Sequence, residues 1–309
     1  LLMDDVFGEE NFLNEIIWAY QSGGRAKRHF SRKHDTILFY RKSNQHYFNP
    51  DAVGKPRGLS KRNNMKRQTD SDGRIFWSIR SGGKEYRYYE DSKILLSDVW
   101  DDISHLQQKH PERTGYDTQK PEALLERMIL STSRPGDWVG DFFAGSGTTL
   151  AAAQKSGRKW MGVDNGDFSI QVCRKRLLKA SQKGCLYFYD SSLKMQKYDD
   201  NSHEVLHGGK IKIDFKEAAN QYLKVSLLDY QCRRMAELSD YFVDYIDYWS
   251  IGYLKDEKFI SKEYSFRTQS NPELKTVLTM PINDMEKNEA AALHIIDIYG
   301  KQFLLILSF

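Results

Sequence analysis

The chain has 309 residues, more than the ~100 to 200 residues typical of one domain, so we expect two domains or one domain with a large insertion. Its three cysteines have no metal-ligand spacing and are too few for a disulfide framework, which favours a reducing, cytoplasmic location and no metal site. The apolar runs are far shorter than the ~20 residues of a membrane span, and no secretory signal opens the chain, so we expect no membrane association.

The net charge of +4 hides a local concentration of positive charge. Between Tyr20 and Glu90, 17 Lys and Arg stand against 6 Asp and Glu, a surplus of 11. This density is the expected footprint of a surface that meets phosphates. On charge alone, a solvated basic loop explains the surplus equally well.

The first half of the chain begins with two segments typical of strands. Residues 14–20 and 36–42 are short, β-branched and aromatic, and a polar Gly-Ser-Lys-Arg loop separates them, so we expect neighbouring strands at a sheet edge. Residues 44–116 have little regular periodicity, yet aromatic residues recur among the basic ones. This composition favours a folded insertion over a linker.

The next block is the most regular. Its pattern predicts alternating helices and strands, with the order of a doubly wound parallel sheet. The expected elements are a helix at 121–131 with Pro121 as its first residue, a turn at 134–137, a buried strand at 138–143, a tight turn at 145–147, a helix at 148–156 closed by Gly157, a strand at 159–164 and a helix at 168–180.

After about residue 184 the character of the sequence changes. Alternating or short apolar runs separated by polar turns predict strands at 222–229, 241–249, 274–280, 292–299 and 302–309, with a helical stretch at 231–238. We therefore expect a first domain at 1–184, with an insertion at 43–115, and a separate β-rich domain at 185–309. The aromatic residues Tyr245, Tyr248, Trp249 and Tyr253 favour a hydrophobic core over a binding site.

The residues Asp141-Phe-Phe-Ala-Gly-Ser-Gly-Thr-Thr149 carry the chemistry. They place a glycine-rich loop at the carboxyl end of a parallel strand, where open α/β sheets bind ligands, and glycine lets the backbone approach a ligand closely. The loop lacks the Gly-Lys-Ser/Thr of a triphosphate-binding loop and the three-glycine dinucleotide fingerprint. Asp164 ends the next strand, where a carboxylate can accept both hydroxyls of a ribose.

These residues, together with Thr118-Gln-Lys-Pro121, Arg134-Pro-Gly-Asp137, Gly157-Arg-Lys-Trp160 and Gly162-Val-Asp164, closely resemble the cofactor half of the N6-adenine and N4-cytosine DNA methyltransferases. The opening segment Leu1 to Trp18 and Lys33 to Tyr40 resemble the type III-like branch of restriction-modification methylases, in which the catalytic half precedes the cofactor half. Phe142, in place of the family's usual Pro, and Gly140, in place of a bulkier residue, depart from the pattern.

The resemblance implies a Rossmann-like S-adenosylmethionine-dependent methyltransferase sheet and a site for S-adenosylmethionine. The residues implied in cofactor binding are Thr118, Gln119, Lys120, Pro121, Asp141, Phe142, Phe143, Ala144, Gly145, Ser146, Gly147, Thr148, Thr149 and Asp164. By itself, Asp141 is equally suited to cap the following turn.

The family's catalytic Asp-Pro-Pro-Tyr motif, which holds the flipped base, is absent from these residues. The resemblance places that motif and its strands upstream, so we expect this chain alone to bind the donor without methylating.

The insertion has the position of a target-recognition region. The residues expected to contact DNA phosphates are Lys33, Arg57, Lys61, Arg62, Lys66 and Arg67.

The favoured function is therefore transfer of a methyl group from S-adenosylmethionine to adenine N6 of duplex DNA in a restriction-modification system. A restriction subunit or a homodimer is an expected partner. Three alternatives stay open: N4-cytosine methylation, a non-catalytic DNA-binding module that keeps the donor pocket, and a methyltransferase acting on RNA or a small molecule.

Overall fold

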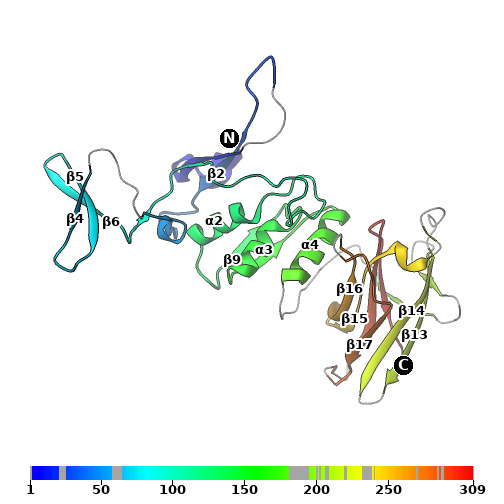
Figure 1. Cartoon of the computed structure of the whole chain (residues 1–309). Coiled ribbons are helices and arrows are strands. Elements are labelled where there is room, and N and C mark those ends of the chain that lie inside the picture. Colours follow the sequence, from blue (N-terminus) through cyan, green and yellow to red (C-terminus); the bar gives the residue numbers. More distant parts are fainter. Residues whose placement is uncertain are drawn as a thin grey trace. The chain divides into compact units, whose positions relative to one another are not determined.

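The computed structural model describes residues 2–20, 26–57, 65–180, 195–199, 201, 203–205, 209–218, 221–231, 239, 241–268, 271–283, 285–286 and 289–308. The chain divides into two compact units, Leu1–Arg176 (unit 1) and Leu177–Phe309 (unit 2). Figure 1 shows helices and strands mixed in the first and strands dominating the second. The helical stretch expected at 231–238 and the expected boundary at 184 fall almost wholly outside the described residues.

Unit 1 begins with short helices and a three-stranded sheet of order β2-β1-β8, in which β1 pairs with β2 antiparallel and with β8 parallel. This confirms that the two amino-terminal strands are neighbours. The bounds are α1 Leu2–Phe7, η1 Glu9–Asn11, β1 Phe12–Ala19, β2 His34–Tyr40 and β8 Val99–Trp100.

The insertion is folded, as expected. It contains a three-stranded antiparallel sheet of order β4-β5-β6 and a short pair, β3-β7. The side chains of Phe76 and Trp77 are buried in the larger sheet. The bounds are η2 Pro50–Ala52, β3 Lys55–Pro56, β4 Lys66–Thr69, β5 Ile75–Ser81, β6 Lys84–Tyr89 and β7 Lys93–Ile94.

The rest of unit 1 follows the predicted helix and strand order. A parallel pair, β9 and β10, is joined through α3, and α2 packs against α3 on one face of the pair. Ala152 and Ala153 are buried against Ile129 of α2 and beside Val139 of β9, because their small side chains let α3 approach closely. The bounds are α2 Glu122–Thr132, β9 Trp138–Asp141, α3 Thr148–Lys155, β10 Lys159–Gly162 and α4 Asp167–Ala180.

Two details of this block correct the sequence prediction. Pro121 is the cap that precedes α2 and not its first helical residue. The strand at 138–143 is shorter, ends at Asp141 and is not buried: the Trp138 side chain is 68% exposed and Phe142 is exposed. Successive strand side chains point to opposite faces, and the described residues cover only the face that carries Val139.

Two turns stabilise the connections around this block. In the turn at 134–137, the Asp137 carboxylate accepts a hydrogen bond from the Arg134 backbone N–H at 2.8 Å. The buried guanidinium of Arg158 donates to Ser133, at 2.6 Å to its carbonyl and 3.1 Å to its Oγ, and to the Ser156 carbonyl at 2.6 Å. The Gly-Arg-Lys-Trp motif is thus explained by structure, because Arg158 holds the end of α2 to the start of β10.

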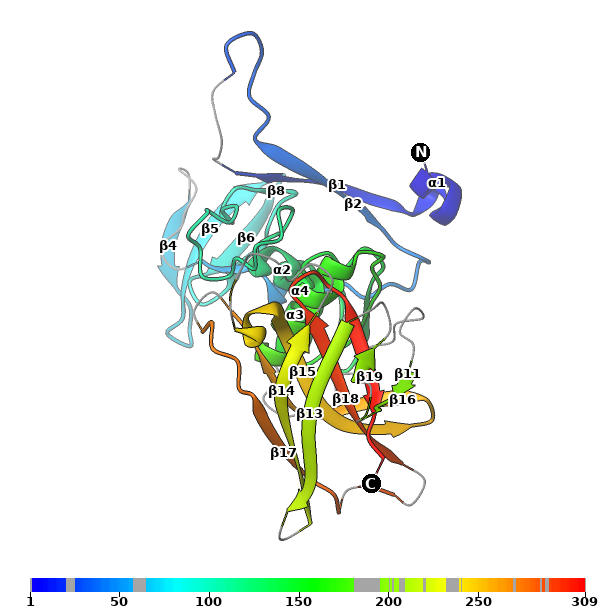
Figure 2. The ribbon, with the colours of Figure 1, turned by 90° about the vertical axis from the view of Figure 1, so that its right-hand side faces the viewer.

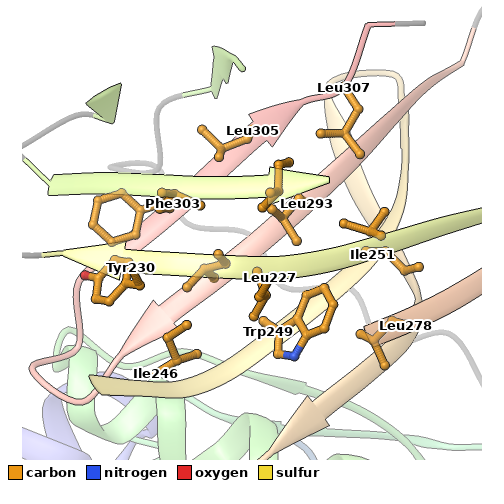
Figure 3. Packing of buried hydrophobic residues seen from close by; sticks show 14 of the residues in the cluster. Leu227, Tyr230, Ile246, Trp249, Ile251, Leu278, Leu293, Phe303, Leu305 and Leu307 are labelled. Carbon is orange, nitrogen blue, oxygen red and sulfur yellow. The ribbon is translucent and has the colours of Figure 1, made fainter. Parts of the chain in front are cut away.

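Unit 2 is built from two sheets, one of order β11-β19-β18-β15-β16 and one of order β12-β13-β14-β17. Their inner faces share one hydrophobic core. Figure 2 shows the strands of these sheets, and Figure 3 shows the core in close-up, with Trp249, Leu227 and Leu293 directed inward. The bounds are β11 Met195–Lys197, β12 Glu204–Val205, β13 Gly209–Ala218, β14 Tyr222–Gln231, η4 Phe242–Tyr245, β15 Ile246–Lys255, β16 Lys258–Phe266, β17 Val277–Pro281, β18 Ala290–Asp297 and β19 Gln302–Ile306.

The sequence predicted most of these strands, with some errors. The strand expected at 241–249 was wrong in its first half, because residues 242–245 form the short helix η4 and β15 starts only at Ile246. The strand expected from residue 274 begins at Val277. Tyr245 and Trp249 are fully buried in this core, which confirms the core interpretation for these two residues. Tyr248 is buried outside this cluster, and Tyr253 is only half-buried.

Candidate functional site

The glycine-rich loop leaves β9 and is tied by backbone hydrogen bonds to β10. The Val163 N–H donates to the Asp141 carbonyl at 2.8 Å, and the Ala144 N–H donates to the Val163 carbonyl at 3.0 Å. The Asp141 carboxylate accepts from the Phe143 N–H at 3.1 Å. Asp141 therefore caps the turn, as one interpretation of the sequence predicted, and the loop follows the end of the parallel pair.

The two glycines of the loop are required by conformation and packing. Gly145 has a φ of 51° and Gly147 a φ of 70°, in the left-handed region that favours glycine. A Cβ at Gly147 would lie 2.7 Å from the Cys173 Sγ on α4, and one at Gly145 would lie 3.2 Å from the Tyr116 ring. From the sequence, close approach to a ligand was the expected reason for these glycines. The structure adds a second reason, because Cys173 and Tyr116 leave little room for a side chain at these positions.

Asp164 is the residue that closes the loop. Its Oδ2 accepts from the Gly145 N–H at 2.8 Å, and its Oδ1 accepts from the Gly166 N–H at 2.9 Å. Burial opposes the charged form, but the hydrogen bonds from Gly166, Gly145 and the Ser169 side chain outweigh it and hold the pKa of Asp164 below its usual value. A fixed, ionised carboxylate thus stands beside the loop at neutral pH.

The loop residues divide into a buried set and an exposed set. Ala144, Ser146, Gly147 and Thr148 are buried. The Thr148 hydroxyl lies 2.9 Å from the Ser146 Oγ and accepts from the Arg176 guanidinium at 2.9 Å. Phe142 is exposed, Phe143 is 92% exposed, and Thr149 is half-buried. The exposed part of the loop and the half-buried Asp164 are open to a ligand.

The Thr-Gln-Lys-Pro segment lies directly beside the loop, because the Thr148 hydroxyl donates to the Lys120 carbonyl at 3.3 Å. Thr118 is exposed and Pro121 is buried. The Gln119 amide is engaged within the protein: its oxygen accepts from the Thr114 N–H at 2.9 Å and its nitrogen donates to the Glu112 carbonyl at 2.7 Å. The role of Gln119 in this structure is to hold the preceding loop.

The Lys120 side chain points to the amino-terminal sheet. Its Nζ lies 2.5 Å from the Asp35 carboxylate on β2 and 5.4 Å from the centre of the Trp18 ring on β1. Hydrogen bonding to Lys120 is the main reason that the pKa of Asp35 is lowered. The sheet β2-β1-β8 is thereby connected to the loop region.

Sequence reasoning missed three residues of this region. Tyr116 contacts the position of Gly145 and stacks on Phe168, with ring centroids 6.0 Å apart. Burial raises the pKa of the Cys173 thiol to about 12, so the thiol stays protonated, and it donates to the Gly145 carbonyl at 3.2 Å. Tyr116 precedes the predicted segment by two positions, so its proximity was a usable signal, whereas nothing in the sequence marked Phe168 or Cys173.

The described residues that were expected to contact phosphates come from several segments of unit 1. Lys33 precedes β2, Arg57 follows β3, and Lys66 and Arg67 lie on β4. Arg57 stacks on the Tyr88 ring, with its guanidinium carbon 4.7 Å from the ring centre, and Arg67 pairs with Glu90 at 3.1 Å. Lys61 and Arg62 lie outside the described residues.

Within the described part of the chain, no three His, Cys, Asp or Glu side chains gather where they could hold a metal ion. No helix among these residues combines the length and the apolar character needed to cross a membrane.

A family model described as "DNA methylase" matches residues 1–175. The chain is 34% identical over 170 residues to the DNA adenine methyltransferase YhdJ of Escherichia coli, covering 54% of this chain and 53% of that protein. It is 37% identical over 170 residues to the type II methyltransferase M1.MboII of Moraxella bovis, covering 52% and 61%. The chain therefore spans about half the length of the curated relatives it matches.

Solved structures give a weaker likeness. The crystal structure of the M1.HpyAVI-SAM complex matches with 22% identity and a TM-score of 0.36, over 57% of this chain and 68% of that one. The PvuII cytosine-N4-specific DNA methyltransferase matches with 16% identity and a TM-score of 0.38, over 62% and 56%.

Proposed function

Because the chain belongs to the N6-adenine/N4-cytosine DNA methylase family, we propose that unit 1 binds S-adenosylmethionine for methyl transfer to adenine N6 in duplex DNA. The complete protein then acts as the methyltransferase of a restriction-modification system. The choice of adenine is supported by the name of the YhdJ relative, and the restriction-modification context by the type II relatives.

The observation that carries the proposal is the fixed carboxylate of Asp164 beside Gly145. Each carboxylate oxygen accepts one backbone N–H, and the Ser169 side chain donates to the carboxylate as well. An ionised carboxylate has about four lone-pair directions, so acceptor capacity remains for a ribose hydroxyl. The lowered pKa keeps Asp164 ionised at neutral pH. These groups fit the ribose portion of the donor.

The neighbouring groups fit the remaining parts of the donor. The α3 helix begins after Gly147 with no side-chain cap, so its first backbone N–H groups remain available to a carboxylate. The exposed Phe143 ring offers an apolar surface next to them. When bound, S-adenosylmethionine supplies an electrophilic methyl group, and the residues of this chain hold and orient it.

Calorimetric titration with S-adenosylmethionine tests the donor site. The Asp164→Ala variant should lose at least about tenfold in affinity, since a charge-assisted hydrogen bond to the ribose disappears. Asp101→Ala is the matched control, because Asp101 is an exposed carboxylate outside the loop region, and its affinity should equal that of the wild type. Equal affinity in Asp164→Ala and the wild type would remove Asp164 from the site.

The base specificity needs a second measurement. Nucleosides from DNA of cells that express the complete protein should contain N6-methyladenine, detected by mass spectrometry, and the signal should disappear with Asp164→Ala. N4-methylcytosine in its place would establish the alternative specificity of the same family. The absence of both modified bases would favour the non-catalytic DNA-binding alternative.

A further inference from the structure

Residues 26–33, the described loop that precedes β2, combine positive charge with an exposed aromatic ring. Residues 26–33 read Ala-Lys-Arg-His-Phe-Ser-Arg-Lys and contain no acidic residue. The Phe30 side chain is 98% exposed. Among the described residues, the side chains of Lys27, Arg28 and Arg32 form no ion pair within 4.0 Å. The function proposed above assigns no role to Phe30.

This loop has local order and a rigid base. The Ala26 N–H donates to the Ser31 Oγ at 2.9 Å, which closes the loop on itself around Phe30. At the base, the Tyr20 N–H donates to the Lys33 carbonyl at 2.9 Å. From Asn14 to Ala19, β1 pairs with β2 in unbroken antiparallel register, and Figure 2 shows residues 26–33, in blue, extending beyond the ends of the two strands.

The base of the hairpin is connected to the donor region. Trp18 of β1 donates from its indole N–H to the Ile103 carbonyl at 2.7 Å. Asp35, at the start of β2, pairs with Lys120, whose carbonyl accepts from the Thr148 hydroxyl in the first turn of α3. The base of the hairpin is therefore linked through Lys120 to the first turn of α3, which lies beside the proposed donor site.

A single exposed apolar residue is common on protein surfaces. The residues around Phe30, however, indicate which kind of partner this part of the surface binds. Cations that lack carboxylate partners favour a polyanion, and an aromatic ring between them can stack on bases. Proteins that distort duplex DNA insert apolar side chains between base steps, and enzymes that modify a base must take it out of the stack. A protein partner with an acidic surface would match the charge but gives no reason for a single protruding ring.

We propose that Phe30 inserts into duplex DNA at the space that the target nucleotide leaves when it turns out of the helix. Arg28 and Arg32 contact the flanking phosphates. This inference rests on the proposed function, because it takes duplex DNA as the substrate, and it adds the residue that fills the gap in the base stack.

Binding to two fluorescent duplexes of the same sequence, one intact and one with a single abasic site, tests the proposal. The wild-type chain should bind the abasic duplex more tightly, because the space for Phe30 is already open there. Phe30→Ala should weaken binding to the abasic duplex roughly 5- to 150-fold, the range for loss of one aromatic stacking contact, and should abolish the preference. Because the ring is exposed, the variant should fold normally, and circular dichroism verifies this.

Two control variants separate stacking from charge. Tyr241→Ala removes an exposed aromatic ring from unit 2 and should bind both duplexes as the wild type does. Arg32→Gln should weaken binding to both duplexes equally and reduce the slope of log affinity against log salt by about 0.9.

The outcomes distinguish this inference from the function on which it rests. If Phe30→Ala binds both duplexes as the wild type does, the insertion is refuted while donor and DNA binding stand. If the wild type binds neither duplex, both the insertion and the DNA substrate are refuted, and the donor titration is unaffected. Phe30-dependent binding to anionic lipid vesicles without DNA binding would also overturn the proposal.

Discussion

Substituting Gly147 by Ala tests the packing of the loop against α4. The backbone there has a φ of 70°, and a new Cβ would lie 2.7 Å from the Cys173 Sγ and 3.2 Å from the Cys173 Cα. The left-handed conformation costs a non-glycine residue about 1 to 2 kcal/mol. Overpacking of a tight contact costs about 1 to 3 kcal/mol more. Gly147→Ala should therefore lower the free energy of unfolding of unit 1 by about 2 to 5 kcal/mol.

Gly157 provides a matched control for this prediction. Its φ is 71°, but a Cβ there would meet no atom within 4 Å. Gly157→Ala should therefore lower the free energy of unfolding only by the cost of the left-handed conformation, about 1 to 2 kcal/mol. Urea unfolding followed by circular dichroism measures the stability of both variants. Met280→Ala, in the core of unit 2, identifies the transition of unit 1 as the one whose midpoint it leaves unchanged. Equal losses in the two glycine variants would refute the contact with Cys173.

Three other variants have expected outcomes in the same unfolding assay. Asp102 receives two hydrogen bonds from Arg127, at 2.9 and 2.7 Å, and these hold the pKa of Asp102 well below its usual value. Asp102→Asn should cost about 1 kcal/mol at pH 7. Because the folded pKa is depressed, this difference should be complete above pH ~4 and shrink as the pH falls below it; a difference that stays the same between pH ~4 and pH ~2 would contradict the assignment. Trp249→Ala should destabilise unit 2 alone, by about 3 to 5 kcal/mol, because the side chain is fully buried. Arg158→Lys should destabilise unit 1 by about 1 to 3 kcal/mol, since an ammonium cannot reproduce the paired bonds to Ser133, and an unchanged midpoint would show those bonds to be dispensable.

The sequence predicted the helices and strands between residues 121 and 180 to within a few residues of each boundary. Helical periodicity and glycines with positive φ, such as Gly157 at the end of α3, are local signals that tertiary structure did not override. The strands β13 and β16 were not predicted. In β13, Ile211 and Ile213 alternate with Lys, and a strand with one charged face contains no continuous apolar run that would mark it.

The site was less predictable than the fold. Sequence resemblance marked Gln119 and Ser146, but their contacts depend on which side of the loop faces the protein, and a linear motif does not contain that information. The Gln119 side chain is occupied by Thr114 and Glu112, and Ser146 is buried next to Arg176. Asp164 was predictable because the end of a strand fixes its position by topology.

The outward face of the β9 and β10 pair has a consequence for the solution behaviour of this chain. Trp138, Phe142, Met161 and Val163 are all exposed there, and within the described residues β9 has a hydrogen-bonded neighbour only on its β10 side. An open strand edge beside exposed apolar side chains is a template for self-association. The isolated chain should therefore stay monodisperse only at low concentration, and light scattering should show reversible association as concentration rises, which bears on every binding measurement made with it.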